Sequence, residues 1–311
     1  MRSVIPATCP APEIAAVPAR SALQARLADY LELTKPRIAL LALITVAMGF
    51  GLASAGNWEL IPLVHALFGI TLVAASSSAF NQLFEVDTDA RMRRTQNRPL
   101  PAGRMGPGEV ILFGLVTGIC GVAYLACFVN ALTAALGVLT LVLYAGVYTP
   151  LKRKTGLNTV VGAIPGALPP VLGWTAAGGS LDMGAFSLFA ILFLWQFPHF
   201  MAIAWIYREE YARAGLKMLP IEDTRHLTTG YLAVAYALAL IPVSLLPNQV
   251  GLAGHGYSLA ALFLGGGYLW SSIKFLRNQS VPTARSLLWT SIAHLPLLLG
   301  ALVSDHYWLL K

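Results

Sequence analysis

Long apolar stretches alternate with short polar segments along most of the chain. The apolar stretches run for about 18 to 23 residues, the length at which an α-helix crosses a hydrocarbon core of about 30 Å. They lack the segments of about ten residues, with alternating apolar and polar positions, that mark the strands of a membrane barrel. The pattern predicts nine membrane-spanning helices, at residues 38–55, 62–84, 108–129, 131–149, 158–177, 184–206, 228–247, 257–275 and 286–304.

The composition supports a membrane protein and excludes an ordinary soluble domain. Of the 311 residues, 57% are hydrophobic and only 11% are charged, whereas about 25% of the residues of a typical soluble domain are charged. A soluble fold of this length could not cover so much apolar surface. We expect an all-α integral membrane protein in which residues 1–34 form a cytoplasmic tail, amphipathic near 22–34, and residues 35–311 form a single membrane-embedded domain.

Lys and Arg residues fall almost entirely on one side of the predicted topology. The chain has 21 of them, and all except Lys311 lie in the N-terminal segment or in the connections after the second, fourth, sixth and eighth spans. Because positive residues concentrate in cytoplasmic loops, the N-terminus is predicted to be cytoplasmic and the C-terminus to lie outside. Attraction to anionic lipid explains the net charge of +7, so this charge does not indicate a nucleic-acid partner.

A polar cluster interrupts the apolar pattern at the end of the second span. If the helix continues to residue 89, Asn81, Glu85 and Asp89 are each turned by about 40° from the one before, so they face one cavity while Asp87 points away. Two carboxylates and an amide one turn apart suit Mg²⁺ that also binds phosphate oxygens of a substrate. The alternative is a solvated helix end, but acids in the last helical turn oppose the helix dipole and are costly at membrane depth.

Basic residues follow this cluster closely. Arg94 and Arg98 lie just downstream, and Lys152 and Arg153 lie in the next cytoplasmic connection. Guanidinium groups match phosphate oxygens bidentately, so these residues are candidates to clamp a diphosphate. Cations and a metal beside an apolar bundle indicate a substrate with an anionic head and an apolar tail, such as a prenyl diphosphate.

A second polar cluster closes the sixth span, where residues 195–211 read WQFPHFMAIAWIYREEY. In a continuous helix, His199 and Glu210 would differ by only about 20° in direction, with the imidazole inside the membrane and the carboxylate at its edge. His199 follows Pro198, where backbone groups can be freed. A structural hydrogen bond, contact with a haem and proton handling all remain open for this histidine.

A second acidic ligand set is expected where the sixth span ends. Glu209 and Glu210 are expected to form this set, which faces Glu85 and Asp89, so that metal ions could be held on both sides of one diphosphate.

The fifth span contains three prolines within GAIPGALPPVLGW at 162–174. A kinked helix that lines a cavity and simple tolerance of proline within a bundle are equally compatible with that stretch.

Together these motifs resemble a known family. The pattern N-x-x-x-D-x-x-x-D followed by RT-x-x-RPL is similar to the UbiA superfamily of intramembrane prenyltransferases, and stands here as Asn81, Glu85 and Asp89 followed by RTQNRPL at 94–100. The segments YTPLKRKTGLNTVVGAIPGALPPVLGW, WQFPHFMAIAW and YREEYARAGLKMLP resemble, more narrowly, the protohaem IX farnesyltransferases, or haem O synthases. The likeness covers about residues 32–305, and it departs from the family pattern at Glu85, where the family has aspartate.

The resemblance implies a UbiA-type bundle with a cytoplasmic-side active site in a bacterial inner membrane. It implies farnesyl diphosphate and haem B as substrates, Mg²⁺ as cofactor and haem O for terminal oxidases as product, with haem A synthase or oxidase assembly as further partners. By resemblance, the site residues are Asn81, Glu85, Asp89, Glu209 and Glu210 for catalysis, all but Glu209 also binding the metal; Arg94, Arg98, Tyr148, Lys152 and Arg153 for the diphosphate; and His199 for contact with the haem.

Three alternatives are weighed against this assignment. A UbiA-type enzyme that prenylates an aromatic quinone precursor would need the same acidic and basic clusters, and only the haem-specific segments distinguish it. A transporter would carry acids at mid-membrane on several spans, whereas here they gather at one edge beside arginines. A structural partner of an oxidase would leave the paired clusters without a purpose.

Overall fold

The computed structural model describes residues 21–55, 58–219 and 227–309, and the regular secondary structure within these ranges is helical. In these ranges, nine helices are long and apolar enough to cross a membrane, as the hydropathy pattern predicts. The expected cytoplasmic tail lies outside the described residues up to position 20. The first half of the chain contains α1 (Ala22–Leu33), α2 (Pro36–Ala53), α3 (Leu60–Asp89), α4 (Pro107–Phe128), α5 (Ala131–Leu141), the π-helix η1 (Val142–Tyr148) and α6 (Thr149–Leu151).

The second half begins with the proline-rich fifth span, which is broken into two helices at Leu168. Pro169 has no N–H to continue the ladder of helical hydrogen bonds, so the break follows directly from the sequence. The prolines therefore interrupt the fifth span, whereas its role in lining a cavity stays a prediction. The remaining helices are α7 (Asn158–Ala167), α8 (Pro169–Ala176), α9 (Met183–Ile206), α10 (Arg208–Arg213), α12 (Thr228–Val243), α13 (Leu246–Gln249), α14 (His255–Arg277) and α15 (Val281–Leu309).

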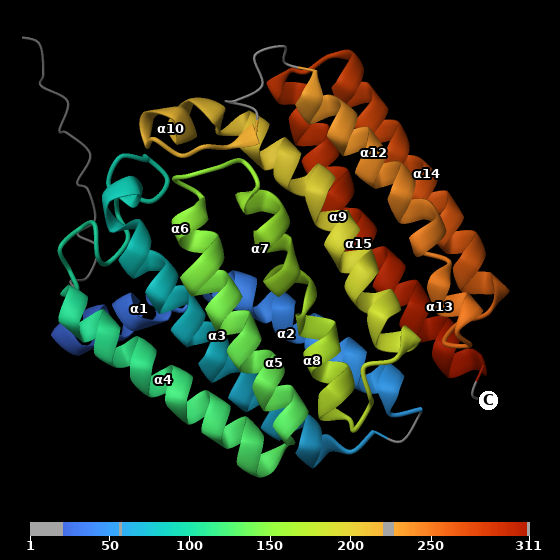
Figure 1. Cartoon of the computed structure of the whole chain (residues 1–311), viewed down its shortest axis with the longest axis horizontal. Helices are drawn as coiled ribbons and strands as arrows, with labels where there is room; N and C mark the ends of the chain where they lie inside the picture. The colour runs from blue at the N-terminus through green and yellow to red at the C-terminus, as the bar shows by residue number, and fades with distance from the viewer. Residues whose placement is uncertain (1–20, 56–57, 220–226, 310–311) are drawn as a thin grey trace, which may run out of the picture.

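The spans pack side by side as a bundle (Figure 1). α3 lies against α4, α2 against α8, and α9 against α7, α12 and α15, while α14 packs against both α12 and α15. The contact between α2 and α8 is close because of Gly173, where an added Cβ would lie 1.8 Å from the Val46 carbonyl oxygen. Small residues permit such approaches between membrane helices, where close packing drives association.

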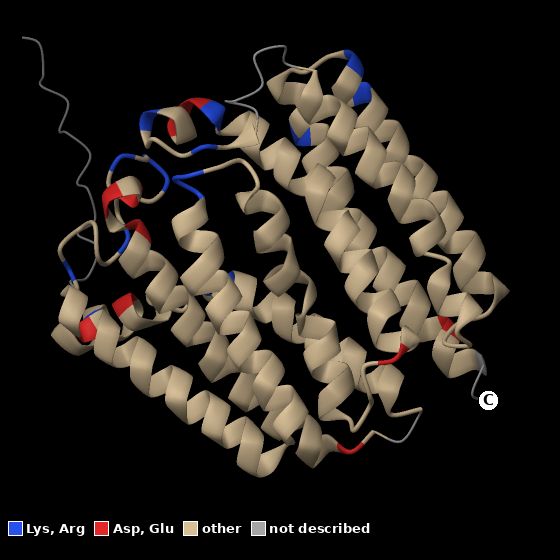
Figure 2. Cartoon of the chain, viewed as in Figure 1, with Lys and Arg blue, Asp and Glu red and all other residues tan. Residues whose placement is uncertain are grey.

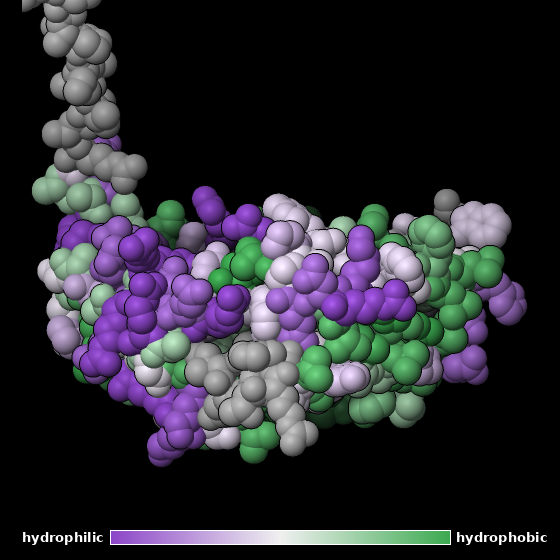
Figure 3. Space-filling model, turned by 90° about the horizontal axis from the view of Figure 1, so that it is seen from above, coloured by the Kyte–Doolittle hydropathy of each residue, from purple (hydrophilic) through white to green (hydrophobic). Residues whose placement is uncertain are grey.

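The outer surface of the bundle is apolar along the spans and polar at one end. Ile119, Phe263 and Trp289 are 67%, 83% and 69% exposed, which suits contact with lipid. Lys and Arg residues gather at the end of the bundle near α10 and the connections after α3 and α6 (Figure 2). The view from above shows a broad hydrophilic area over this end, beside hydrophobic surface (Figure 3).

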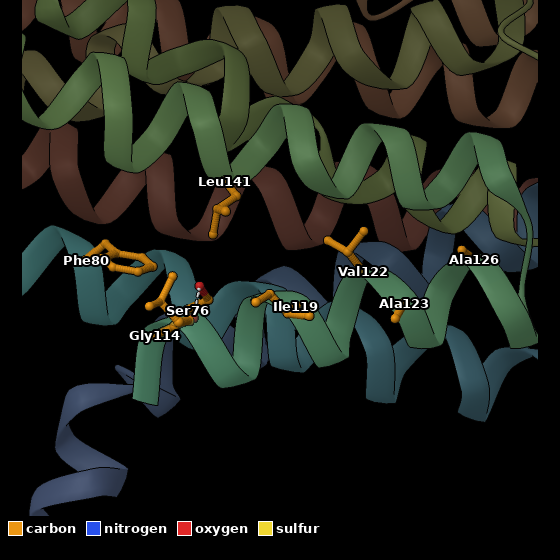
Figure 4. A pocket seen from close by; sticks show the side chains of 10 residues that line it. Ser76, Phe80, Gly114, Ile119, Val122, Ala123, Ala126 and Leu141 are labelled. Carbon is orange, nitrogen blue, oxygen red and sulfur yellow. Dashed lines mark hydrogen bonds between the residues drawn. The ribbon is translucent and has the colours of Figure 1, made fainter. Parts of the chain in front are cut away.

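An apolar groove of about 410 Å³ lies between α3, α4 and α5 (Figure 4). Phe80, Ile119 and Leu141 are among its lining residues. Phe80 directly precedes Asn81, so the two side chains leave α3 about 100° apart. The groove therefore lies on a different face of α3 from the predicted acidic site.

Candidate active site

The first acidic face forms as the sequence predicts. α3 continues without a break to Asp89, so Asn81, Glu85 and Asp89 lie along one side of the helix, and all three are buried. Asp87 points elsewhere: 71% of its side chain is exposed, and its carboxylate lies 3.6 Å from the guanidinium of Arg153. The predicted separation of Asp87 from the other three residues is confirmed.

Two of the predicted cations pair with the two buried carboxylates. The Lys152 ammonium lies 2.7 Å from Glu85 Oε1, and the Arg98 guanidinium lies 2.6 Å from Asp89 Oδ2. Burial works against the charged form of Lys152, but Tyr148 and the Glu85 carboxylate outweigh it and raise the pKa of this ammonium above its ordinary value. The pairs compensate charges that would otherwise be costly to bury, and they fasten the loops after α3 and α6 to the end of α3.

Lys35 completes this set, although no sequence motif marks it as a site residue. Its ammonium donates a hydrogen bond to the side-chain oxygen of Asn81, and burial lowers the pKa of Lys35 to about 7. The residue adopts φ 53° immediately before Pro36, a left-handed backbone that persists only where the surroundings hold it. Gln82 supplies part of that hold by donating from Nε2 to the Leu33 carbonyl at 2.9 Å. The available sequence signal was a lysine directly before proline at the start of the first span.

A π-helix places Tyr148 at the edge of the site. Pro150 has no N–H to donate to the Gly146 carbonyl four residues earlier. The Thr149 N–H instead donates to the carbonyl of Tyr144, five residues back, and the Thr149 hydroxyl donates to the same carbonyl at 2.8 Å. Such π-turns often occur at functional sites. After this wider turn, the Tyr148 ring lies beneath Lys152, whose ammonium is 4.4 Å from the ring centroid.

Replacing Gly162 with alanine is expected to displace Tyr148 and to destabilise the fold by about 1 to 3 kcal/mol, the usual cost of overpacking. A Cβ at Gly162 would lie 2.5 Å from Cε2 of the Tyr148 ring. Thermal unfolding in one detergent would measure the effect. Gly146→Ala is the control, since a Cβ there meets nothing within 4 Å. Equal melting temperatures for the two variants would contradict this packing.

The second acidic cluster does not share a helix with His199. α9 ends at Ile206, and the separate helix α10 begins at Arg208, after Tyr207 with φ −104° and ψ 16°. The expectation that His199 and Glu210 lie on one face of a continuous helix is therefore wrong. The apolar span has ended at this point, and the chain turns so that α10 packs against the loop after α3 through a buried apolar cluster.

α10 and the segment after it contact the connections that carry the first cluster's cations. Tyr211 belongs to the same buried apolar cluster as Met92, in the loop after α3. Further along, the Lys217 N–H donates to the Lys152 carbonyl at 2.9 Å, and Asn158 Nδ2 donates to the Lys217 carbonyl at 2.9 Å. The two acidic motifs, about 120 residues apart in the sequence, therefore lie at the same end of the bundle.

The two glutamates of α10 have different surroundings. Glu209 has a side chain that is 85% exposed and lies 3.9 Å from Arg208. Glu210 Oε2 is buried and has no hydrogen-bond partner among the described residues, and Asp89 Oδ1 is in the same condition. A buried carboxylate oxygen without a partner is costly. The two oxygens therefore mark where a cation or a substrate donor would be accommodated.

The described part of the chain does not hold a preassembled metal centre, since it contains no group of three His, Cys, Asp or Glu side chains placed to bind an ion. The donors nevertheless fit Mg²⁺. The amide and carboxylate oxygens of Asn81, Glu85, Asp89 and Glu210 are hard ligands, and two of these residues have a buried oxygen without a partner. Mg²⁺ in proteins usually keeps several waters and uses one or two carboxylates together with substrate phosphate oxygens.

The other two predicted diphosphate residues are not at the buried carboxylates. Arg94, in the loop after α3, lies with its guanidinium carbon 5.2 Å from the centroid of the Tyr207 ring, directly before α10. Arg153 contacts Asp87 and donates to the Phe84 carbonyl at 3.2 Å. The structure therefore brings Arg98 and Lys152 to the first cluster, and leaves Arg94 and Arg153 at its rim.

His199 lies deeper in the bundle, on α9. Its Nδ1 is 2.7 Å from the hydroxyl of Ser291 on α15. Its ring stacks on Trp195, with centroids 4.9 Å apart and planes at 25°. The imidazole is half-buried, so it is held on one side by α15 and by its own helix while remaining partly accessible.

The fold and the site define an integral membrane enzyme with an apolar bundle and a cation-rich acidic centre at one end. Among solved structures, the chain resembles a digeranylgeranylglyceryl phosphate synthase, with a TM-score of 0.78 and 18% identity over 91% of this chain and 99% of that one. A UbiA homologue from Archaeoglobus fulgidus bound to GPP and Mg²⁺ has a TM-score of 0.63 and 20% identity, over 88% of this chain and 99% of its own.

The sequence comparisons specify the family. The UbiA prenyltransferase family matches residues 42–295, and the chain belongs to that family. It is 46% identical over 286 residues to a protoheme IX farnesyltransferase from Solibacter usitatus, covering 89% of this chain and 98% of that protein. It is 45% identical to the enzyme of the same name from Koribacter versatilis, over 93% of this chain and 96% of that protein.

Proposed function

We propose that this prenyltransferase joins farnesyl diphosphate to a vinyl group of haem B, giving haem O and diphosphate. The observation that carries the proposal is the buried face of α3, on which Asn81, Glu85 and Asp89 each contact a cation from another segment. Such a set suits a ligand that is itself anionic and binds metal. The relatives named protoheme IX farnesyltransferase support haem B as the acceptor.

The cations of the site have two uses in this reaction. Arg98 and Lys152 neutralise the two buried carboxylates before the substrate binds, and these two residues together with Lys35 can donate hydrogen bonds to the diphosphate oxygens when the substrate enters. Asn81, Glu85, Asp89 and Glu210 would then hold Mg²⁺, which offsets the charge that develops on the leaving diphosphate. Prepositioned positive groups in a site shielded from water act strongly on such developing charge.

In the transfer, the farnesyl group leaves the diphosphate and joins a vinyl group of haem B. The bond between farnesyl C1 and the diphosphate oxygen breaks, and its electron pair leaves with the diphosphate. One vinyl carbon of haem B bonds to C1, and water adds to the other vinyl carbon with loss of a proton, which produces a hydroxyethylfarnesyl group. The Tyr148 ring, which already lies beneath the Lys152 ammonium, would stabilise positive charge near the broken bond. The surrounding apolar helices limit premature attack by water.

The charge distribution supports a particular orientation of the enzyme in the membrane. Lys and Arg gather at the end of the bundle that carries the site, and positive residues are retained on the cytoplasmic side of bacterial inner membranes. This supports an active site that opens towards the cytoplasm and a C-terminus outside. In an Asp87→Cys variant whose three native cysteines are replaced, labelling by an impermeant thiol reagent should therefore require permeabilised cells. Labelling at that position in intact cells would contradict the orientation.

Removal of Mg²⁺ is expected to abolish the reaction. The purified protein in detergent, given haem B, farnesyl diphosphate and Mg²⁺, should form haem O detectable by mass spectrometry, and EDTA should eliminate that product. Excess Mg²⁺ added after EDTA should restore it, which controls for damage by the chelator. Prenylation of a hydroxybenzoate or quinone precursor in place of haem B would move the assignment to the aromatic branch of the family.

A further inference from the structure

A hydrogen-bond chain determines which nitrogen of His199 carries its proton. Ser291 is fully buried, and its hydroxyl oxygen lies 2.6 Å from the Leu288 carbonyl and 2.7 Å from His199 Nδ1. A carbonyl oxygen only accepts hydrogen bonds, so the single hydroxyl proton lies towards Leu288. The hydroxyl oxygen must then accept from His199, which places the imidazole proton on Nδ1. In the neutral imidazole, His199 Nε2 therefore carries the lone pair.

The ring is also fixed in orientation by a shared set of contacts. Trp195 stacks on the imidazole of His199, and Trp195 Nε1 donates to the Ser291 carbonyl at 2.9 Å. The Tyr268 hydroxyl, on α14, donates to the Trp195 carbonyl at 3.0 Å. One serine on α15 thus receives a hydrogen bond from the histidine at its side chain and another from the stacked tryptophan at its backbone.

A second histidine nearby shows what makes His199 accessible. His294 Nδ1 lies 3.2 Å from the Leu264 carbonyl, which again places the proton on Nδ1. Its Nε2, however, is buried without a partner among the described residues, and the residue is only 2% exposed. His199 has the same proton arrangement but is half-buried, so its Nε2 is the one that a bound ligand can reach.

We propose that Ser291 is a positioning residue that holds His199 as its Nδ1–H form, so that Nε2 coordinates the iron of bound haem B. A histidine ligand typically donates its second N–H to a neighbouring acceptor, which orients the ring and increases its basicity. Ser291 supplies that acceptor. The inference rests on the proposed function, because it takes haem B as the acceptor substrate.

The test is a titration of the full-length protein in detergent with ferric haem B, followed by optical absorption and electron paramagnetic resonance. His199→Gly should lose the signature of histidine ligation, and added imidazole should restore it. Ser291→Ala should keep the ligand but bind haem about 10- to 100-fold more weakly, the usual effect of losing a supporting hydrogen bond. The reduction potential of its bound haem should rise, because the imidazole becomes a weaker donor.

Two variants separate this role from simple packing. Ser291→Thr keeps the hydroxyl and should return the potential towards that of the unmodified protein. Ser272→Ala removes an equally buried hydroxyl, one that donates to the Tyr268 carbonyl at 3.0 Å within α14, and should leave the haem spectrum unchanged. Normal affinity and potential in Ser291→Ala, or an intact histidine signature in His199→Gly, would overturn the proposal.

The product assay distinguishes failure of this inference from failure of the proposed function. If haem O forms but the spectra do not respond to His199 and Ser291 substitutions, only the assignment of the iron ligand is wrong. If the unmodified protein neither binds haem B nor forms haem O, haem B is not the acceptor and both proposals are overturned.

Discussion

Replacing Asp89 with alanine is expected to lower haem O formation by about 100- to 1,000-fold, the range typical for loss of one group that stabilises charge in a transition state. Asp89 is fully buried, Oδ2 pairs with Arg98 at 2.6 Å, and Oδ1 has no partner within the described residues. Alanine removes both the free oxygen available to a metal and the partner of Arg98. Turnover with haem B and farnesyl diphosphate, normalised to protein in the membrane fraction, measures the loss.

Asp87 provides a matched control for this substitution. It lies two residues earlier on the same helix, but its side chain is 71% exposed and its ion pair with Arg153 is 3.6 Å long. Asp87→Ala removes the same charge from the same end of α3, so it should retain nearly full activity. If Asp87→Ala and Asp89→Ala reduced activity equally, the net charge of the loop would matter, and not the buried face.

Replacing Glu210 with alanine is expected to cause a loss of similar size, although Glu210 lies on another helix. Its Oε2 is buried without a partner among the described residues, and α10 packs against the loop after α3 through the cluster that contains Tyr211 and Met92. Under the proposed function, this carboxylate completes an oxygen ligand set for Mg²⁺ with those of α3. Glu210→Asp should retain some activity and require more Mg²⁺ for half-maximal turnover.

Glu209 distinguishes a ligand role from a general effect of acidic charge. The sequence predicts Glu209 as a catalytic residue, but its side chain is 85% exposed, so Glu209→Ala should leave the rate within a few-fold of normal. A further comparison uses Asp89→Ala combined with Glu210→Ala. Residues that act as one unit show strongly non-additive effects, so the double variant should be little worse than either single one. Normal turnover in Glu210→Ala would remove the second acidic motif from the metal site.

Much of the architecture could be predicted because membrane spans follow a simple physical rule. Backbone groups in lipid must be paired within the helix, so apolar length alone locates the spans. The continuous helix up to Asp89 was likewise predictable, because the interval of four residues between Asn81, Glu85 and Asp89 has a meaning only in a helix. The break at Leu168 followed from Pro169, which cannot donate a hydrogen bond.

Other features depended on contacts between distant segments. The sequence motifs do not single out Lys35, because a lysine at the start of a span is usually explained by topology alone. Its role emerges only when the turn before α2 is placed against Asn81 on α3. The helix break at Tyr207 was also missed, since the sequence there contains neither proline nor glycine, and the turn reflects packing of α10 on the neighbouring loops.

The sequence by itself determined that this chain is a helical membrane protein with its cations on one side, and which carboxylates share a face of the second span. These properties depend on hydropathy, charge count and the period of the α-helix, all of which are local. Only the tertiary structure decided that Arg98 and Lys152, but not Arg94 and Arg153, reach the buried carboxylates. It also decided that Glu210 and Glu209 differ in burial and that Ser291 orients His199. Those outcomes depend on which side chains meet across helices, and no local pattern encodes such contacts.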